Sequence, residues 1–323
     1  MRAPATCGPS CETVAAMKYG VNTMVWTTRV DERLASLFSK IKGWGFDGVE
    51  LFLSPGEPAN IPTVKKMLDA TGLERTMCSV LPREANLVNS DAQVRARGVE
   101  FLKRCVDRTA ELGASLICGP LYAGLGVMTG TRRTAEEWKW AAEGLAEVAE
   151  RAQTVRVTLC LEPLNRFETY FLNTQQDAAK LVKDIGAPNV RVHFDTFHAN
   201  IEERDPAASL RSIAKVLGHV HISENDRGTP GTGHVDWHGV LSVLKQIKYD
   251  GWLTIESFAQ PEPDLAAAAA IWRDLSRSGD ELAKSGIQFI KQLAKEVEEE
   301  KEQKPAVRQR KVLSSKKKSA NRK

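Results

Sequence analysis

Eight short apolar runs recur along the chain, and a longer stretch with helical spacing follows each one. The runs are rich in β-branched and aromatic residues and cover residues 19–26, 48–53, 75–81, 116–121, 157–163, 190–195, 219–223 and 252–257. Apolar runs of this length predict buried strands. Their regular alternation with helical segments predicts βα units that share a parallel sheet.

The helical segments often end at a glycine, the residue that best tolerates the left-handed backbone of a helix C-terminus. Gly72, Gly113, Gly186 and Gly218 are examples. Eight βα units within one domain predict an α/β fold of the (β/α)8 TIM-barrel type. We expect a flexible N-terminal extension over 1–16, a catalytic barrel domain over 17–296 and a disordered basic tail over 297–323.

Four of the eight runs end in an ionisable residue where an apolar run would otherwise continue. These residues are Glu162, Asp195, His221 and Glu256, on the fifth to eighth runs. The C-terminal ends of barrel strands meet at one mouth, where active sites of this fold lie. Three carboxylates and an imidazole would repel one another there unless a cation lies among them. We therefore expect a divalent metal ion, Mn²⁺ first and Co²⁺ or Mg²⁺ next; four separate salt bridges are the alternative.

The net charge of +4 conceals an uneven distribution of charge along the chain. Residues 303–323 carry nine Lys or Arg side chains and no acidic ones, so the rest of the chain holds 36 basic against 41 acidic side chains. A block of like charge is typical of a solvated tail. Because the body is acidic, we expect no nucleic-acid partner.

The apolar segments and the cysteines predict a soluble, cytoplasmic protein. The longest apolar stretches, such as residues 266–272, are far shorter than the roughly 20 residues of a membrane span, and residues 1–16 lack the apolar core of a secretory signal. Cys78, Cys118 and Cys160 lie in apolar segments, where a free thiol packs like a small hydrophobe. Such thiols are typical of a reducing compartment.

Four strings of residues carry a resemblance to a known family. They are LEPLNRFETYFLNT (161–174), HFDTFHANIEE (193–203), GHVHISENDRGTPGTGHVDW (218–237) and LTIESF (253–258). In order, spacing and strand position they resemble the D-tagatose 3-epimerase and D-psicose (allulose) 3-epimerase family of xylose isomerase-like TIM barrels. The resemblance covers residues 17–296 and implies a homodimer or homotetramer.

The resemblance also implies roles for particular residues. It makes Glu162, Asp195, His221 and Glu256 the metal ligands. It further implies that Glu168, His198 and Arg227 hold hydroxyl and carbonyl oxygens of the sugar. An ordinary loop salt bridge is the alternative for Glu168 and Arg227, and a satisfied buried histidine is the alternative for His198.

The implied activity is that of a metal-dependent ketose 3-epimerase acting on a free ketohexose or ketopentose. Carbon 3 would lose and regain its proton through a metal-stabilised enediolate. The family gives this proton transfer to the two metal-bound glutamates, here Glu162 and Glu256, one on each face of the carbon. An aldose–ketose or hydroxypyruvate-type isomerase would use the same site and return the proton to the neighbouring carbon.

Two other classes of protein fit these residues less well. A DNA-repair endonuclease on the same kind of barrel uses a multi-zinc cluster with more histidines, whereas this chain has six, none of them on the first four runs. A catalytically silent sugar-binding protein would not need bases on both faces of one carbon.

Three residues on the first two runs carry weaker expectations. Trp26 is expected to form an apolar wall against the sugar, with core packing as the alternative. The first run, residues 19–26, lacks the aromatic residue that the best-known relatives place near Asn22, so contacts to the far end of the sugar are expected to differ. Glu50 is expected either to hydrogen-bond at the barrel mouth or to form a structural salt bridge.

Overall fold

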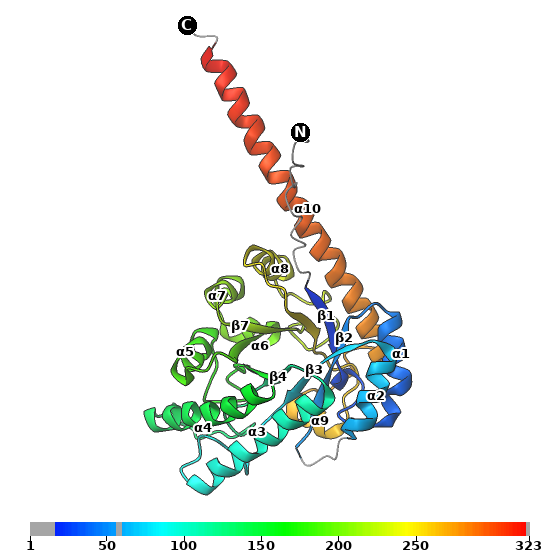
Figure 1. Cartoon of the computed structure of the whole chain (residues 1–323). Helices are drawn as coiled ribbons and strands as arrows, with labels where there is room; N and C mark the ends of the chain where they lie inside the picture. Colours follow the sequence, from blue (N-terminus) through cyan, green and yellow to red (C-terminus); the bar gives the residue numbers. More distant parts are fainter. Residues whose placement is uncertain (1–16, 56–59, 321–323) are drawn as a thin grey trace, which may run out of the picture.

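Eight parallel strands close into a barrel in the order β1 to β8, and the helices surround it (Figure 1). The structure is a computed structural model that describes residues 17–55 and 60–320, with only the backbone described from 301 onward. β1 pairs with both β2 and β8, which closes the sheet. The predicted TIM barrel is therefore confirmed.

Each strand overlaps one of the eight predicted apolar runs. The strands are β1 Lys18–Asn22, β2 Gly48–Leu53, β3 Glu74–Ser79, β4 Leu116–Gly119, β5 Thr158–Leu161, β6 Val190–Asp195, β7 Leu217–Ile222 and β8 Trp252–Ile255. All six residues of β2 are buried, because barrel strands face side chains inside the barrel and helices outside it.

The helices follow the predicted segments between the strands. They are α1 Ala35–Gly43, α2 Ile61–Thr71, α3 Ala92–Leu112, α4 Ala135–Thr154, α5 Gln175–Ile185, α6 Thr196–Glu202, α7 Pro206–Ser212, α8 Trp237–Gln246, α9 Pro263–Ala269 and α10 Gly279–Ala320, with 3-10 turns η1 Thr23–Val25 and η2 Glu32–Leu34. Gly72, Gly113 and Gly186 take the left-handed conformation at helix ends, as predicted.

Gly218 is a correction to the predicted helix ends. It lies within β7, because α7 ends at Ser212 and the strand begins at Leu217. A Cβ atom at position 218 would lie 2.5 Å from Cβ of Arg191 and 2.7 Å from Sγ of Cys160. Close packing between neighbouring strands, and not a helix end, therefore explains this glycine.

Helix α10 runs past the barrel and away from it (Figure 1). The predicted domain boundary at residue 296 falls inside this helix, and the expected disorder of 297–323 stays a prediction. The expected flexible extension over 1–16 lies outside the described residues. Within the described part of the chain, no helix is both long and apolar enough to cross a bilayer.

Candidate active site

The four predicted metal ligands lie together at the mouth of the barrel. Glu162 follows β5, Asp195 ends β6, His221 lies near the end of β7 and Glu256 follows β8. All four side chains are buried, and one possible ligand atom from each lies within 4.8 Å of the others. Successive strands of a closed barrel bring these residues together although they are spread over 95 positions of the chain.

Distances from the imidazole show how tightly the cluster is built. His221 Nδ1 lies 3.4 Å from Glu256 Oε1, 3.7 Å from Asp195 Oδ2 and 4.0 Å from Glu162 Oε1. Among the described residues, neither His221 Nδ1 nor Glu162 Oε1 has a hydrogen-bond partner. Buried polar atoms are rarely left unpaired, and oxygen atoms with one imidazole nitrogen suit a hard divalent cation. The cluster can therefore hold a metal ion.

The pKa values in the cluster reflect crowded charge. Burial, followed by the Glu256 carboxylate, raises the pKa of Glu162 well above its ordinary value. Burial acts in the same direction on Asp195 and Glu256, but His221 and Arg227 outweigh it and lower the pKa values of both. A divalent charge among the three carboxylates would relieve their mutual repulsion.

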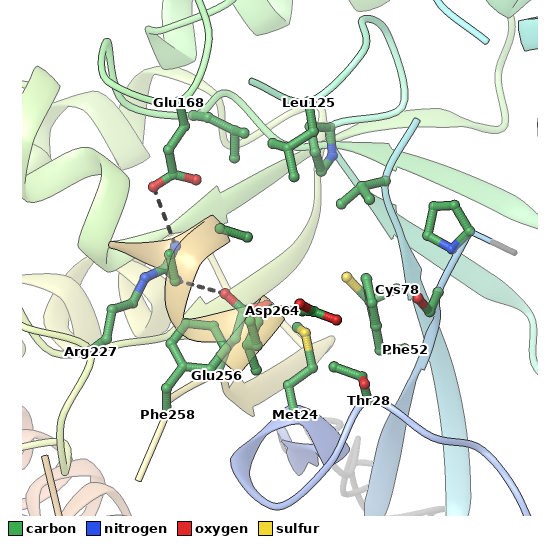
Figure 2. Close-up of a pocket in the computed structure, with 18 of the residues that line it drawn as sticks. Met24, Thr28, Phe52, Cys78, Leu125, Glu168, Arg227, Glu256, Phe258 and Asp264 are labelled. Carbon is green, nitrogen blue, oxygen red and sulfur yellow. Dashed lines mark hydrogen bonds and ion pairs between the residues drawn. The ribbon is translucent and has the colours of Figure 1, made fainter. Parts of the chain in front are cut away.

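A pocket of about 340 Å³ opens directly above the cluster. Glu162, Glu256, Glu168, His198 and Arg227 line it, so the structure brings the predicted catalytic pair and three of the four predicted substrate-binding residues to one cavity. Its apolar wall includes Met24, Phe52, Cys78, Leu125 and Phe258 (Figure 2). A mainly apolar cavity with a few converging polar groups is the usual form of a small-molecule site.

Arg227 is held between acidic and aromatic side chains. Its Nη1 donates to Glu256 Oε2 at 2.7 Å, and Nη2 lies 3.9 Å from Glu168 Oε1 (Figure 2). The guanidinium carbon lies 4.0 Å from the ring centre of Phe197 and 5.2 Å from that of Phe258. Such stacking fixes the plane of the guanidinium group, so its donors point into the pocket.

His198 contacts neighbouring residues through both ring nitrogens. The backbone amide of Asn165 donates to His198 Nδ1 at 3.0 Å. Arg227 Nη2 lies 3.1 Å from His198 Nε2, so both ring nitrogens face hydrogen-bond donors of the protein. Burial, followed among the lowering causes by the Arg227 charge, lowers the pKa of His198, which favours the neutral ring. Nε2 also lies 3.6 Å from Glu162 Oε1, so His198 and Arg227 meet beside the predicted proton-transfer residue.

Trp26 does not reach this pocket. Its indole Nε1 donates to Asp280 Oδ1 at 2.9 Å, and its ring stacks on Trp44 with centres 6.2 Å apart. The chain leaves β1 through the turn η1, which carries Met24 toward the pocket and Trp26 toward the start of α10. The structure thus matches the packing alternative for Trp26. Met24 lines the pocket, where Trp26 was expected to form an apolar wall.

Some residues near the site were missed or left open by the sequence patterns. Asn165 donates through Nδ2 to Glu168 Oε1 at 2.7 Å, and the LNRFE string gave no sign of this contact. Glu224 lies three residues after His221, and its carboxylate accepts hydrogen bonds from backbone amides of the loop that carries Arg227. Glu50 is fully buried below the cluster, 2.6 Å from His221 Nε2, and lies outside the described lining of the pocket.

Comparisons with known proteins agree with this geometry. A family model described as xylose isomerase-like TIM barrel matches residues 38–293. The chain is 35% identical over 277 residues to the L-ribulose 3-epimerase of Mesorhizobium japonicum, which covers 84% of this chain and 93% of that protein. It is 32% identical over 268 residues to the D-psicose 3-epimerase of Agrobacterium fabrum, which covers 82% of this chain and 93% of that protein.

A solved structure has the same arrangement of the chain. The D-allulose 3-epimerase from Methylomonas sp. in complex with D-allulose superposes with a TM-score of 0.82 at 30% identity. The match covers 86% of this chain and 97% of that one. It therefore extends over nearly the whole relative and includes both the barrel and its mouth.

Proposed function

The chain belongs to the xylose isomerase-like TIM barrel family, among its ketose 3-epimerases, and from this premise we propose that it epimerises carbon 3 of a free ketohexose or ketopentose with a divalent cation as cofactor. It is an isomerase that acts on ketose sugars. Relatives named for L-ribulose and for D-psicose make these two sugars the first substrates to test. Mn²⁺ is the cation we propose, with Co²⁺ or Mg²⁺ as alternatives.

The observation that carries the proposal is the pair of buried carboxylates, Glu162 and Glu256, that converge on one cavity together with Asp195 and His221. A proton next to a ketone is only weakly acidic, and inversion at that carbon needs a base on one face and an acid on the other. A binding protein would have no use for two such groups. A cation held by the four side chains would act as a Lewis acid on the substrate oxygens.

The residues of this chain would then divide the remaining work. One glutamate removes the proton of carbon 3 and the other returns a proton to the opposite face. Arg227 donates from its guanidinium group to the oxygens on which negative charge develops in the enediolate, and His198 holds these oxygens beside it. Glu168, held by Asn165, accepts from a sugar hydroxyl. The apolar wall around Met24 and Phe52 excludes water from the reacting carbon.

An aldose–ketose isomerase is the second candidate, because the same cluster supports it equally. The test is product analysis after incubation with fructose, tagatose, ribulose and hydroxypyruvate, with chelator and then with Mn²⁺ added back. We expect a ketose with inverted carbon 3, formed only when metal is present. An aldose product would support the isomerase, and full activity after complete removal of metal would contradict the proposal.

A further inference from the structure

A buried network centred on Glu50 lies below the metal cluster, on the side of His221 away from the pocket. Glu50 Oε1 lies 2.6 Å from His221 Nε2, and Glu50 Oε2 lies 2.8 Å from His219 Nε2. The side chain of Glu50 is fully buried and does not appear among the described residues that line the pocket. It therefore touches a proposed ligand without being able to touch the sugar.

Side chains from three other strands hold Glu50 in place. Asn22 Nδ2 on β1 donates to Oε1 at 2.9 Å, and Thr76 Oγ1 on β3 and Cys118 Sγ on β4 donate to Oε2 at 2.9 and 3.3 Å. The Asn22 amide cannot be reversed, because its Oδ1 accepts from the Met24 amide at 2.9 Å. Asn22, Glu50 and Thr76 are register partners across adjacent strands. Every donor points at the carboxylate, so Glu50 acts as an acceptor.

The two nitrogens of His221 therefore have different surroundings. Nε2 faces Glu50, which accepts hydrogen bonds, whereas Nδ1 faces the carboxylates of Glu162, Asp195 and Glu256 and has no hydrogen-bond partner among the described residues. A neutral imidazole carries its proton on one nitrogen and a lone pair on the other. With the proton held on Nε2 by Glu50, the lone pair of Nδ1 points to the centre of the cluster, where a ligand to a cation is needed.

Burying a carboxylate beside a histidine costs free energy, and a pair of apolar residues in place of the two would often be at least as stable. Glu50 is thus better explained by what it does to His221 than by stability. We propose that Glu50 is a positioning residue, which fixes the tautomer and the ring orientation of His221 so that Nδ1 serves as the metal ligand. This inference rests on the proposed function, since it concerns the same metal site.

The first test measures Mn²⁺ binding to the metal-free, full-length chain by isothermal titration calorimetry. Glu50→Gln keeps the shape of the side chain and removes its charge, and we expect Mn²⁺ affinity to fall by about 10- to 100-fold. Asp69→Asn is the control, because the Asp69 carboxylate also accepts from two donors, Lys65 and Arg75, but lies in α2, outside the metal cluster and the pocket. We expect wild-type affinity in the control; equal affinity in Glu50→Gln and wild type would overturn the inference.

A double-mutant cycle separates positioning from a general structural role. In a His221→Ala background, the additional change Glu50→Gln should leave Mn²⁺ affinity unchanged, because Glu50 has no ligand left to orient. A further loss of affinity in that background would overturn the inference. Two Mn²⁺ ions per wild-type chain, with one lost in Glu50→Gln, would also overturn it, because Glu50 would then be a ligand itself.

A third test uses the wild-type protein alone. The ¹⁵N chemical shifts of His221 in the Mg²⁺-loaded protein should show a protonated Nε2 and an unprotonated Nδ1. A protonated Nδ1 would overturn the inference. The two proposals fail differently: a wild-type chain that binds no divalent cation contradicts both, whereas tight wild-type binding that survives Glu50→Gln contradicts only the role of Glu50.

Discussion

Glu162 and Glu256 have different surroundings although both are proposed to move protons. Burial and the Glu256 charge raise the pKa of Glu162, whereas His221 and Arg227 overcome the effect of burial and lower the pKa of Glu256. Each carboxylate reaches the pocket from a different strand, β5 or β8. Two bases with separate positions are what inversion at one carbon requires.

Glu162→Gln and Glu256→Gln should therefore each reduce epimerisation by about 10²- to 10⁴-fold. In deuterium oxide, each variant should still exchange the proton of carbon 3 in one epimer, because the remaining glutamate serves one face. The two variants should differ in which epimer exchanges. NMR of both epimers, with metal content measured in parallel, checks this. Exchange of both epimers by a single variant would show that proton transfer belongs to another group.

The Glu224 carboxylate holds the loop after β7 together through hydrogen bonds. Its carboxylate accepts from the amides of Asn225, Gly231 and Val235 at 2.8 to 3.1 Å and from Trp237 Nε1 at 2.9 Å. Burial alone would raise the pKa of Glu224, but these hydrogen bonds lower it from 4.5. A lowered pKa in the folded state means that the carboxylate stabilises the fold above pH 4.5 and loses this contribution as pH falls below that value.

Glu224→Gln should lower the free energy of unfolding by about 1 to 3 kcal/mol at pH 7, because hydrogen bonds to a charged group are lost. The difference from wild type should shrink as pH falls below 4.5, because the Glu224 carboxylate of the unfolded chain gains its proton there before that of the folded chain does. Urea unfolding of both proteins between pH 7 and pH 3.5 measures it. A difference in unfolding free energy that stays constant from pH 7 to pH 3.5 would show that the charge of Glu224 does not contribute to stability.

At the scale of elements, the ends of the strands decide how the barrel mouth is built. Gly119 ends β4 with a φ of 123°, and a Cβ atom there would lie 2.1 Å from the carbonyl oxygen of Ser79 on β3. Both the backbone conformation and the close approach require glycine. The neighbouring residue Pro120 lines the pocket, so strain at Gly119 would be transmitted to the site.

Gly119→Ala should destabilise the protein by more than about 2 kcal/mol, because strained backbone and overpacking act together. Gly43→Ala is the control, since Gly43 lies in α1 and a Cβ atom there meets nothing within 4 Å. The control should be neutral or slightly stabilising. Thermal unfolding compares the two; equal effects would show that the contact with Ser79 is not maintained in solution.

The elements themselves were predictable from the chain, because each strand is a compact apolar run and each predicted helix has its own spacing. The cluster of the four proposed ligands was predictable for the same reason, since each one interrupts such a run at its end. Trp26 and Gly218 were not, because the turn η1 and the packing of β7 on β6 depend on residues distant in sequence. The Glu50 network joins residues 22, 50, 76, 118 and 221, and only the closed barrel makes them neighbours.

At the scale of the whole molecule, a cation that binds only the folded chain must stabilise it. At a Mn²⁺ concentration 100 times the dissociation constant, the gain is about 2.7 kcal/mol, which raises Tm by roughly 4 °C for a chain of this size. Thermal scans with chelator and with Mn²⁺ measure the shift. Asp195→Asn should reduce it strongly, and an equal shift in this variant would place the stabilising ion elsewhere.

The expected homodimer or homotetramer and the cytoplasmic location stay predictions of the sequence and the family. They concern surfaces and surroundings that the barrel mouth does not determine. The chemistry of the mouth, in contrast, makes one demand on the whole enzyme. Under the proposed function, carbon 3 of the substrate exchanges its proton while the ketone stays in place, and the exchange depends on the cation.

Solvent deuterium incorporation therefore tests the central claim most directly. The Mn²⁺-loaded enzyme is incubated with L-ribulose or D-psicose in deuterium oxide, and each carbon of both epimers is followed by NMR. We predict deuterium at carbon 3, none at carbon 1, and no incorporation after chelation until Mn²⁺ is restored. Deuterium at carbon 1 alone, or incorporation at carbon 3 that continues without metal, would contradict the account.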